Sequence, residues 1–168
     1  MIKNPTSLNT LFLCTGNSAR SILAESLLNR LGKGRHHAWS AGSHPTGTIN
    51  PRAINLLEKL NYKVEHLRSK SWDEFSIQGA PKFNIVITVC DNAANEFCPI
   101  WPGNPVKAHW SLSDPARDFG NEIRNEMAFA RTYERLERLI SGLLDLTVSG
   151  LDGVNAGDDI SSLAHKIK

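Results

Sequence analysis

Apolar and polar positions form alternating blocks along the chain, and these blocks predict strands and helices in turn. Short, nearly continuous apolar runs are typical of buried parallel strands, whereas apolar positions at helical spacing are typical of helices packed on one side. On this basis the predicted strands cover residues 10–13, 38–40, 83–89 and 106–110, and the predicted helices cover 20–31, 51–60 and 121–146, with a shorter helix within 69–75.

Local signals mark several of these boundaries. Asn50 is a suitable N-cap and Pro51 suits the first position of the second helix. Ser71 is placed to cap the short helix, and the glycines after residue 31 end the first one. Residues 91–105 contain several prolines and a glycine, and we predict a long loop there.

The alternation of strands and helices favours an α/β fold, with a parallel sheet that carries helices on both faces. In such sheets, ligands bind at the carboxyl ends of the strands. Cys14, Cys90 and Asp114 each follow a predicted strand. The sequence therefore predicts that these three side chains meet at one edge of the sheet.

A chain of 168 residues suits one domain, and we expect it to occupy residues 1–146. Residues 147–168 differ from the rest because glycines and aspartates interrupt them. Their pattern allows a short helix over 160–167. We predict a weakly docked C-terminal tail here rather than a second domain.

Hydrophobic residues make up 40% of the chain, charged residues make up 21%, and the net charge is +2. This balance predicts neither a nucleic-acid partner nor attraction to a membrane. No apolar run approaches the roughly 18 residues of a membrane span, and the N-terminus lacks an apolar core of signal-peptide length. We therefore expect a cytoplasmic protein.

The chain has three cysteines, Cys14, Cys90 and Cys98. A small, odd number without a secretion signal argues against a structural disulfide framework, and disulfides of cytoplasmic proteins tend to be transient and catalytic. The pattern indicates one nucleophile and two redox helpers. The histidines and cysteines also lack the spacing of zinc ligands.

The first strand runs directly into the segment with the most chemistry, Cys14-Thr15-Gly16-Asn17-Ser18-Ala19-Arg20-Ser21. The backbone amides of such a loop can form an anion nest, and the following helix N-terminus adds positive potential. Arg20 can present a planar, permanently charged fork to two oxygens of an anion. The same field favours a Cys14 thiolate. The competing interpretation is that Cys14 is a small buried hydrophobic residue.

Four patches resemble the low-molecular-weight tyrosine phosphatase superfamily, and within it the arsenate reductases that use a cysteine relay. They are residues 14–21, Ser40-Ala41-Gly42, Val89-Cys90-Asp91-Asn92-Ala93-Ala94 through Cys98-Pro99, and His109-Trp110 through Asp114-Pro115-Ala116. The resemblance implies a three-layer α/β/α sandwich with a four-stranded parallel sheet.

The resemblance also implies a role for each candidate residue. Cys14 would be the nucleophile, Asp114 the general acid, and Arg20 with the loop amides would hold the oxyanion. Cys90 would attack the covalent adduct and Cys98 would then attack Cys90. Asn17 would brace the loop, while Ser21 would donate a hydrogen bond to the Cys14 sulfur. The substrate-binding loop thus comprises Thr15, Gly16, Asn17, Ser18, Ala19, Arg20 and Ser21.

Several positions depart from the family pattern. Cys90 and Cys98 are one residue further apart than in well-known relay members. Ile22 replaces the proline that phosphatases carry after the loop, and Ala116-Arg117-Asp118 replaces their aromatic residues, which weakens a phosphotyrosine interpretation. Some relatives bind potassium through residues matching Asn17, Glu25 and Ser40, but Lys70 lies near the place of a further acidic ligand. We therefore expect neither metal nor cofactor.

Three functions remain open at this stage. The first is arsenate reduction, with thioredoxin, or alternatively glutaredoxin and glutathione, as the reductant. The second is hydrolysis of phosphomonoesters through a phosphocysteine. The third is binding of oxyanions or phosphoproteins without catalysis. Simpler interpretations also stand for single residues, since Cys90 can be an inert buried thiol and Asp114 can merely begin a turn.

Overall fold

The computed structural model describes residues 7–151 and 154–168, with no description of the side chains of 148 and 149. Four parallel strands form one sheet in the order β2-β1-β3-β4. They are β1 (Leu8–Cys14), β2 (His36–Gly42), β3 (Ile85–Thr88) and β4 (Val106–His109). The predicted fold class and all four strands are confirmed, with β1 and β2 longer and β3 shorter than the sequence suggests.

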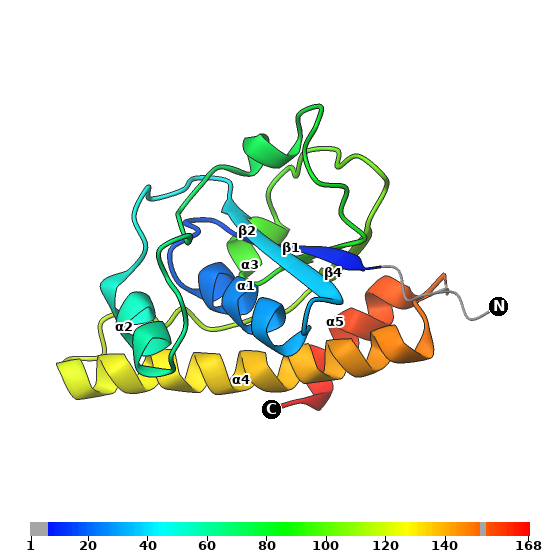
Figure 1. Cartoon of the computed structure of the whole chain (residues 1–168). Coiled ribbons are helices and arrows are strands. Elements are labelled where there is room, and N and C mark those ends of the chain that lie inside the picture. The colour runs from blue at the N-terminus through cyan, green and yellow to red at the C-terminus, as the bar shows by residue number, and fades with distance from the viewer. Residues whose placement is uncertain (1–6, 152–153) are drawn as a thin grey trace.

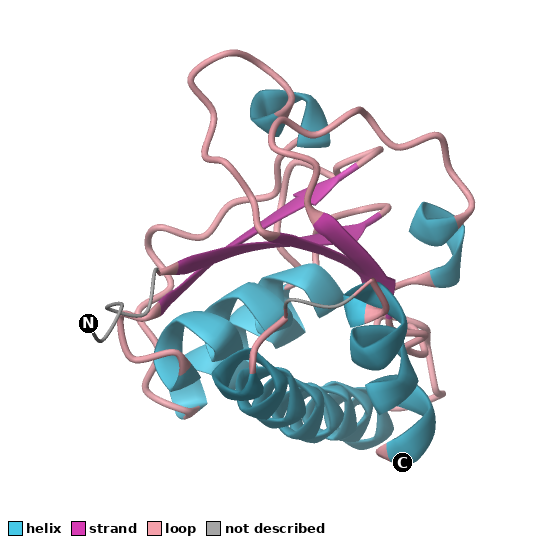
Figure 2. Cartoon of the chain, turned by 90° about the vertical axis from the view of Figure 1, so that its right-hand side faces the viewer, coloured by secondary structure: helices cyan, strands magenta, loops and turns pink. Residues whose placement is uncertain are grey.

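The helices cover the two faces of the sheet unequally. On one face lie α1 (Arg20–Leu31), α2 (Pro51–Lys59), the long α4 (Glu122–Ser149) and α5 (Ala156–Lys166). The other face carries a thinner layer, made of the 3-10 helix η1 (Trp72–Phe75) and of loops (Figure 2). The larger core therefore lies under the helices, and a smaller aromatic cluster lies on the loop side.

Several predicted helix ends are confirmed by their contacts. The Asn50 side chain accepts a hydrogen bond from the Arg52 amide, so Asn50 caps α2 as expected. The Ser71 side chain accepts a hydrogen bond from the amide of Asp73 at the start of η1. One element was missed. Residues 91–105 are not entirely loop, because Asp91–Ala94 forms the one-turn helix α3.

The C-terminal segment differs most from its prediction. Helix α4 continues past residue 146, where the tail was expected to begin, and α5 starts before residue 160. The tail is not weakly docked, since Ile160 is fully buried and its carbonyl accepts a hydrogen bond from Trp110 Nε1 at 2.9 Å. Gly157 lies so close to β4 that a Cβ atom there would meet the Lys107 carbonyl oxygen at 2.4 Å. The α5 helix is therefore part of the core.

The topology fixes where a site can form. Strand β1 lies between β2 and β3. The chain therefore connects β1 to β2 on one side of β1, and the next strand, β3, pairs with β1 on its other side. Such a switch point leaves a crevice beyond the strand ends, where ligands of open α/β sheets bind. Cys14 ends β1 and Cys90 follows β3, so both lie at this edge. None of the helices in the described ranges has the length and apolar character needed to cross a bilayer.

Candidate active site

The carbonyl groups of the loop after β1 accept hydrogen bonds from the neighbouring segment of residues 44–50. The carbonyls of Thr15, Gly16 and Ser18 accept hydrogen bonds from the amides of His44, Thr46 and Asn50, at 2.9 to 3.0 Å. In a trans peptide the N–H points away from the C=O of the same unit. The amides of residues 16, 17 and 19 therefore point to the opposite, concave side, as an anion nest requires.

Asn17 braces this loop. It adopts a left-handed backbone conformation with φ of 45°, which asparagine tolerates better than most residues. Its buried side chain donates to Ser21 Oγ at 2.8 Å and to Ser40 Oγ at 3.0 Å, and it accepts from the Lys70 amide at 2.9 Å. The side chain thus ties the loop to α1, to β2 and to the segment before η1.

Gly42 permits the close approach of the loop to β2. A Cβ atom at this position would lie 2.4 Å from the Thr15 carbonyl oxygen and 3.0 Å from the Asn17 amide nitrogen. Both contacts are with backbone, which cannot swing aside as a side chain can. The glycine of the Ser40-Ala41-Gly42 patch is therefore required by the path of the loop.

Arg20 and Asp114 lie close to each other. Arg20 donates to the Leu112 carbonyl at 2.9 Å, and a second guanidinium nitrogen lies 3.7 Å from Asp114 Oδ1. The Nε atom of Arg20 is buried and has no protein partner in the described residues. The N-cap of helix α1 beside it is Ala19, whose side chain offers no capping acceptor. The first amides of α1 and the guanidinium are thus both available to an anion in the loop.

The two sulfurs of Cys14 and Cys90 shift each other's pKa. The Cys14 thiol donates a hydrogen bond to Cys90, and this bond together with burial raises the pKa of Cys14, while Arg20 acts in the predicted direction and lowers it. The hydrogen bond from Cys14 lowers the pKa of Cys90 to about 5 against the effect of burial, helped by the amides of Ala93 and Thr15, each 3.4 Å from the sulfur. The field of Arg20 is therefore not the only influence on the nucleophile, and the Cys14 thiolate stays a prediction.

Cys98 is not brought to the other two cysteines. Cys14 and Cys90 belong to the core under the helices, whereas Cys98 packs beside the aromatic cluster on the opposite face. It lines a cavity of about 390 Å³ together with Trp101 and residues of α3 and β4. Desolvation raises the pKa of its thiol. All three cysteines are free, so the structure is that of the reduced chain.

Comparison with known proteins settles the family. Residues 9–152 match the model of the low molecular weight phosphotyrosine protein phosphatases. The chain belongs to this family. It is 31% identical over 129 residues to a protein of Halalkalibacterium halodurans named arsenate reductase, covering 77% of this chain and 89% of the relative.

Solved structures of the family include both reductases and phosphatases. An arsenate reductase from Archaeoglobus fulgidus superposes with a TM-score of 0.59 at 26% identity, covering 79% of this chain and 98% of the other. A low molecular weight protein tyrosine phosphatase from T. tengcongensis superposes with a TM-score of 0.62 at 25% identity, covering 83% and 99%. This family member is thus similar to proteins of both activities.

The Ser21 contact that the family resemblance implies is not formed. In the described part of the chain, Ser21 Oγ accepts from Asn17 but makes no hydrogen bond to the Cys14 sulfur. A hydroxyl that does lie beside the cysteine pair is that of Thr15, which is 3.6 Å from Cys90 Sγ and donates to Glu96 Oε1 at 3.4 Å. Sequence reasoning placed Thr15 only in the anion loop, because the approach of α3 to that loop is a tertiary contact.

A polar network that holds α3 was also missed. The carboxylate of Asp91 bonds His109 Nε2 at 2.8 Å and accepts from Ser111 Oγ at 3.1 Å. The other ring nitrogen of His109 lies 2.7 Å from the Thr88 hydroxyl. These contacts hold α3, whose N-cap is Cys90, against β3 and β4. The only signal in the sequence was that all four residues adjoin strand ends.

Behind the loop, Glu25 and Lys70 form a buried ion pair. Glu25 accepts a hydrogen bond from Ser40, and the Lys70 ammonium lies 3.9 Å from its carboxylate. Burial raises the pKa of Glu25 and lowers that of Lys70. The charge of this carboxylate is thus balanced by the protein itself, and no group of three or more metal-binding side chains occurs within the described ranges.

Proposed function

We propose that this protein reduces arsenate to arsenite through a relay of its three cysteines. The observation that carries the proposal is the position of Cys90, whose sulfur lies 3.4 Å from the amide of Thr15, the residue after Cys14 in the anion-binding loop. A second thiol beside the nucleophile can form a disulfide with it. The similarity to proteins named arsenate reductase supports the same conclusion.

In the first step, arsenate binds among the loop amides and the Arg20 guanidinium. Cys14 loses its proton to solvent, favoured by the positive charge of Arg20, and the resulting Cys14 thiolate attacks arsenic. Asp114, which lies beside Arg20, donates a proton to the departing oxygen, so that water leaves and a Cys14–arsenate adduct remains. The positive field of the loop stabilises the charge on the arsenate oxygens.

In the second step, Cys90 loses its proton to solvent and attacks the Cys14 sulfur. The amides of Ala93 and Thr15, which donate to its sulfur, stabilise the attacking thiolate. A Cys14–Cys90 disulfide forms, the bond from sulfur to arsenic breaks, and arsenic takes the electron pair to leave as arsenite. Two sulfurs have then lost two electrons, and arsenic(V) has gained them.

In the third step, Cys98 attacks Cys90 and releases the Cys14 thiolate. This step requires α3 and the following loop to rearrange, because Cys98 lies on the other face of the sheet. A single helical turn offers little resistance to unwinding. An external dithiol, for which we propose thioredoxin, then reduces the Cys90–Cys98 disulfide by thiol exchange. Glutaredoxin with glutathione is the alternative reductant.

The alternative function is phosphomonoester hydrolysis, and one observation favours it. Cys14, Arg20, Asp114 and the loop suffice for attack on phosphorus and for hydrolysis of a phosphocysteine, without Cys90 or Cys98. Similarity to the T. tengcongensis phosphatase supports this candidate. The two functions therefore differ in their need for the second and third cysteines.

Cys90→Ser and Cys98→Ser variants separate the two candidates. Both are expected to lose multiple-turnover arsenate reduction with thioredoxin while keeping the hydrolysis of p-nitrophenyl phosphate. After one turnover, Cys98→Ser is expected to accumulate a Cys14–Cys90 disulfide that mass spectrometry identifies. Cys14→Ser is the control that loses both activities. Arsenate reduction at the wild-type rate in both variants would refute the relay.

A further inference from the structure

A second cavity lies next to the proposed active site and is lined by apolar side chains and arginines. It occupies about 580 Å³ between α4 and the segment of residues 112–119. Leu112, Pro115, Phe119 and Met127 provide apolar walls, and Met127 is 45% exposed. The volume falls in the usual range of small-molecule pockets, roughly 300–1,000 Å³. Asp114 stands at its edge, so the cavity adjoins the site on the side of the proposed general acid.

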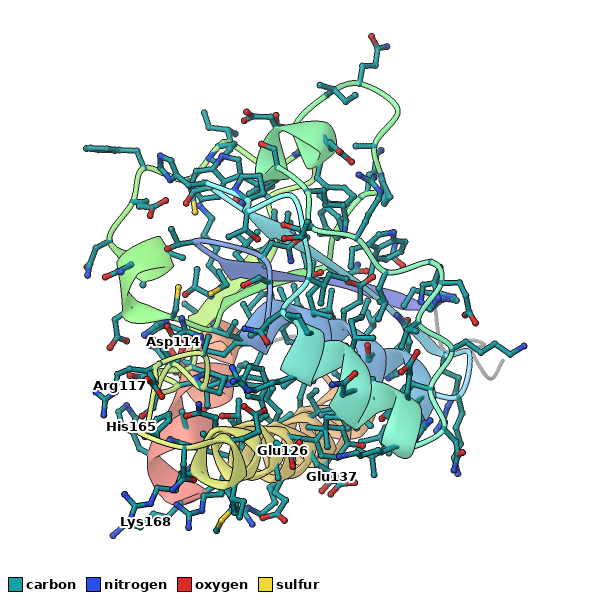
Figure 3. The ribbon with its side chains drawn as sticks, turned by 90° about the vertical axis from the view of Figure 1, so that its left-hand side faces the viewer. Asp114, Arg117, Glu126, Glu137, His165 and Lys168 are labelled. Carbon is teal, nitrogen blue, oxygen red and sulfur yellow. The ribbon has the colours of Figure 1, made fainter. Side chains whose placement is uncertain are left out.

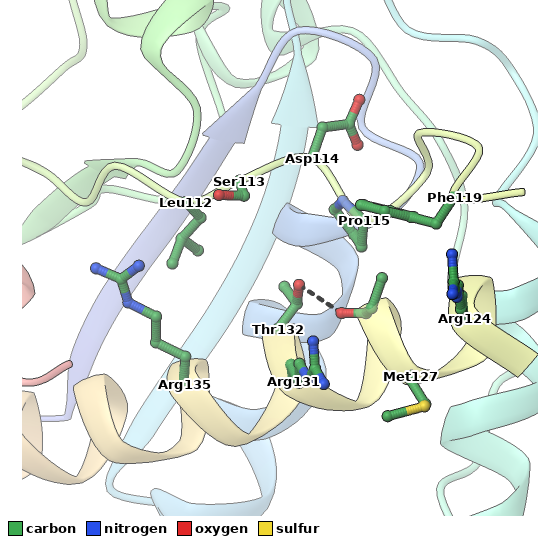
Figure 4. Close-up of a pocket in the computed structure, with 11 residues that line it drawn as sticks. Leu112, Ser113, Asp114, Pro115, Phe119, Arg124, Met127, Arg131, Thr132 and Arg135 are labelled. Atoms are coloured by element: carbon green, nitrogen blue, oxygen red, sulfur yellow. Dashed lines mark hydrogen bonds between the residues drawn. The ribbon is translucent and has the colours of Figure 1, made fainter.

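Three arginines of α4, Arg124, Arg131 and Arg135, line this cavity (Figure 4). Their spacing of seven and four residues puts them on one face of the helix, about 10 Å and about 6 Å apart along its axis. None of the three forms an ion pair within the described ranges. Arg135 donates to the Ala164 carbonyl at 3.1 Å, and its buried Nε has no partner in the same ranges.

No carboxylate of α4 is among the side chains that line the cavity. Glu126 and Glu137 lie on the flank of the helix away from Asp114 (Figure 3), and Glu126 is 3.9 Å from Lys59. Arg117 adds a further cation near the cavity, where its guanidinium lies 5.1 Å from the Phe119 ring. The one carboxylate that lines the cavity, Asp114, is already close to Arg20. The cavity therefore collects positive charge beside apolar surface.

We propose that this cavity is a second anion-binding site, for a small organic molecule that carries two or more anionic groups on an apolar framework. The spacing of Arg124 and Arg131 fits anionic groups about 10 Å apart, and the guanidinium fork binds carboxylates and phosphates equally. The enclosed volume and the apolar walls favour a small molecule over an extended acidic peptide. The proposal does not depend on the proposed arsenate chemistry, because the site uses none of the three cysteines.

Binding of naphthalene-2,6-disulfonate to the reduced full chain, measured by isothermal titration calorimetry at low salt, tests the proposal. We expect one saturable site whose affinity is unchanged by saturating phosphate, which fills the loop at Cys14. Arg124→Gln and Arg131→Gln should each weaken binding by about tenfold or more, because each removes a charge-assisted contact. The matched control is Arg138→Gln, an exposed arginine of the same helix that does not line the cavity.

Competition then identifies the ligand chemistry. Displacement of the probe by naphthalene-2,6-dicarboxylate indicates carboxylate ligands, and displacement by naphthalene-2,6-diphosphonate indicates phosphate-type ligands. Several results would overturn the proposal: no saturable binding, equal weakening in Arg138→Gln, displacement by phosphate at the loop, or tighter binding of an acidic hexapeptide than of the small anions. Because probe binding needs no turnover, an inactive protein that binds the probe would refute the proposed function alone.

Discussion

At the scale of single residues, the decisive feature is the placement of Cys90 beside the loop that begins at Cys14. Cys90 accepts hydrogen bonds from Cys14, from the Thr15 amide and from the Ala93 amide. The hydrogen bond to Cys90 and burial raise the pKa of Cys14, and Arg20 lowers it. Arg20 therefore favours the Cys14 thiolate against the effects of burial and of the neighbouring sulfur.

Removal of the Cys14 donor should make Cys90 a weaker acid. In Cys14→Ala the pKa of Cys90 is expected to rise from about 5, because its largest stabilising hydrogen bond is lost. The rate of Cys90 alkylation by iodoacetamide, followed by mass spectrometry, should level off near pH 5 to 6 in wild type and at higher pH in the variant. Cys98→Ser serves as the control with an unchanged profile. Identical profiles in wild type and Cys14→Ala would show that Cys14 does not lower the pKa of Cys90.

The buried pair behind the loop predicts a pH-dependent loss of stability. Lys70→Met leaves the Glu25 carboxylate buried with Ser40 as its remaining partner, and breaking a buried pair in this way costs about 3–5 kcal/mol. Burial already raises the pKa of Glu25, and loss of the cation raises it further. A raised folded-state pKa favours the folded state most at low pH, so the deficit should grow as pH rises.

Urea unfolding at pH 5 and pH 8 measures this effect. The double variant Lys70→Met/Glu25→Gln should recover much of the lost free energy of unfolding, since no uncompensated charge remains. A deficit in Lys70→Met that is the same at both pH values would show that lost packing, and not the charge of Glu25, is responsible.

At the scale of elements, α5 shows how far a local pattern can mislead. Its glycines and aspartates resemble a loop, yet Gly157 is needed for the close approach to β4, and Asp158 and Asp159 stand in the first turn of the helix. Acidic residues are stabilising at that end of a helix. The helix forms because β4 and α4 supply an apolar surface to bury Ile160.

Substitution in α5 should therefore affect the whole fold. Ile160→Ala is expected to lower the free energy of unfolding by about 2–5 kcal/mol, because a fully buried side chain leaves a cavity. Val154→Ala, at a fully exposed position before the helix, should change it by less than about 0.5 kcal/mol. Chemical denaturation measures both. A loss below about 1 kcal/mol for Ile160→Ala would mean that the tail is weakly docked after all.

At the scale of the whole molecule, the sheet separates the parts of the proposed relay. The first two cysteines lie on the helix side, and the third lies on the loop side between the exposed residues Phe97 and Ile100. The connecting segment is one turn of helix and a loop, while the strands beside it are held by continuous parallel pairing. Any motion that joins Cys90 to Cys98 must fall on residues 91–105.

Hydrogen exchange should detect this motion. We expect the amides of residues 91–95 to lose protection in the protein oxidised to the Cys90–Cys98 disulfide, because α3 must unwind and the Asp91–His109 contact must break. The amides of β3 and β4 should keep their protection. The Cys98→Ser variant under the same oxidant is the control. Unchanged exchange over residues 91–95 in a protein shown to contain the disulfide would exclude this rearrangement.

Local signals in the chain were enough to predict the four strands and the main helices in order, the parallel sheet and the loop after β1. These follow from apolar periodicity, from Asn50 as a helix cap and from the short stretch between Cys14 and Ser21, all of which act over a few residues. The meeting of Arg20 with Asp114 could also be predicted, because strand ends share one edge of a parallel sheet.

The influences on the pKa values of the two sulfurs, the place of Cys98 and the docking of the C-terminal segment emerge only in the folded chain. Each depends on contacts between residues far apart in the chain: Cys90 with Thr15, Cys98 with the aromatic cluster, Ile160 with the large core. The energy of a buried charge or side chain is set by everything that surrounds it, and local pattern does not contain those surroundings.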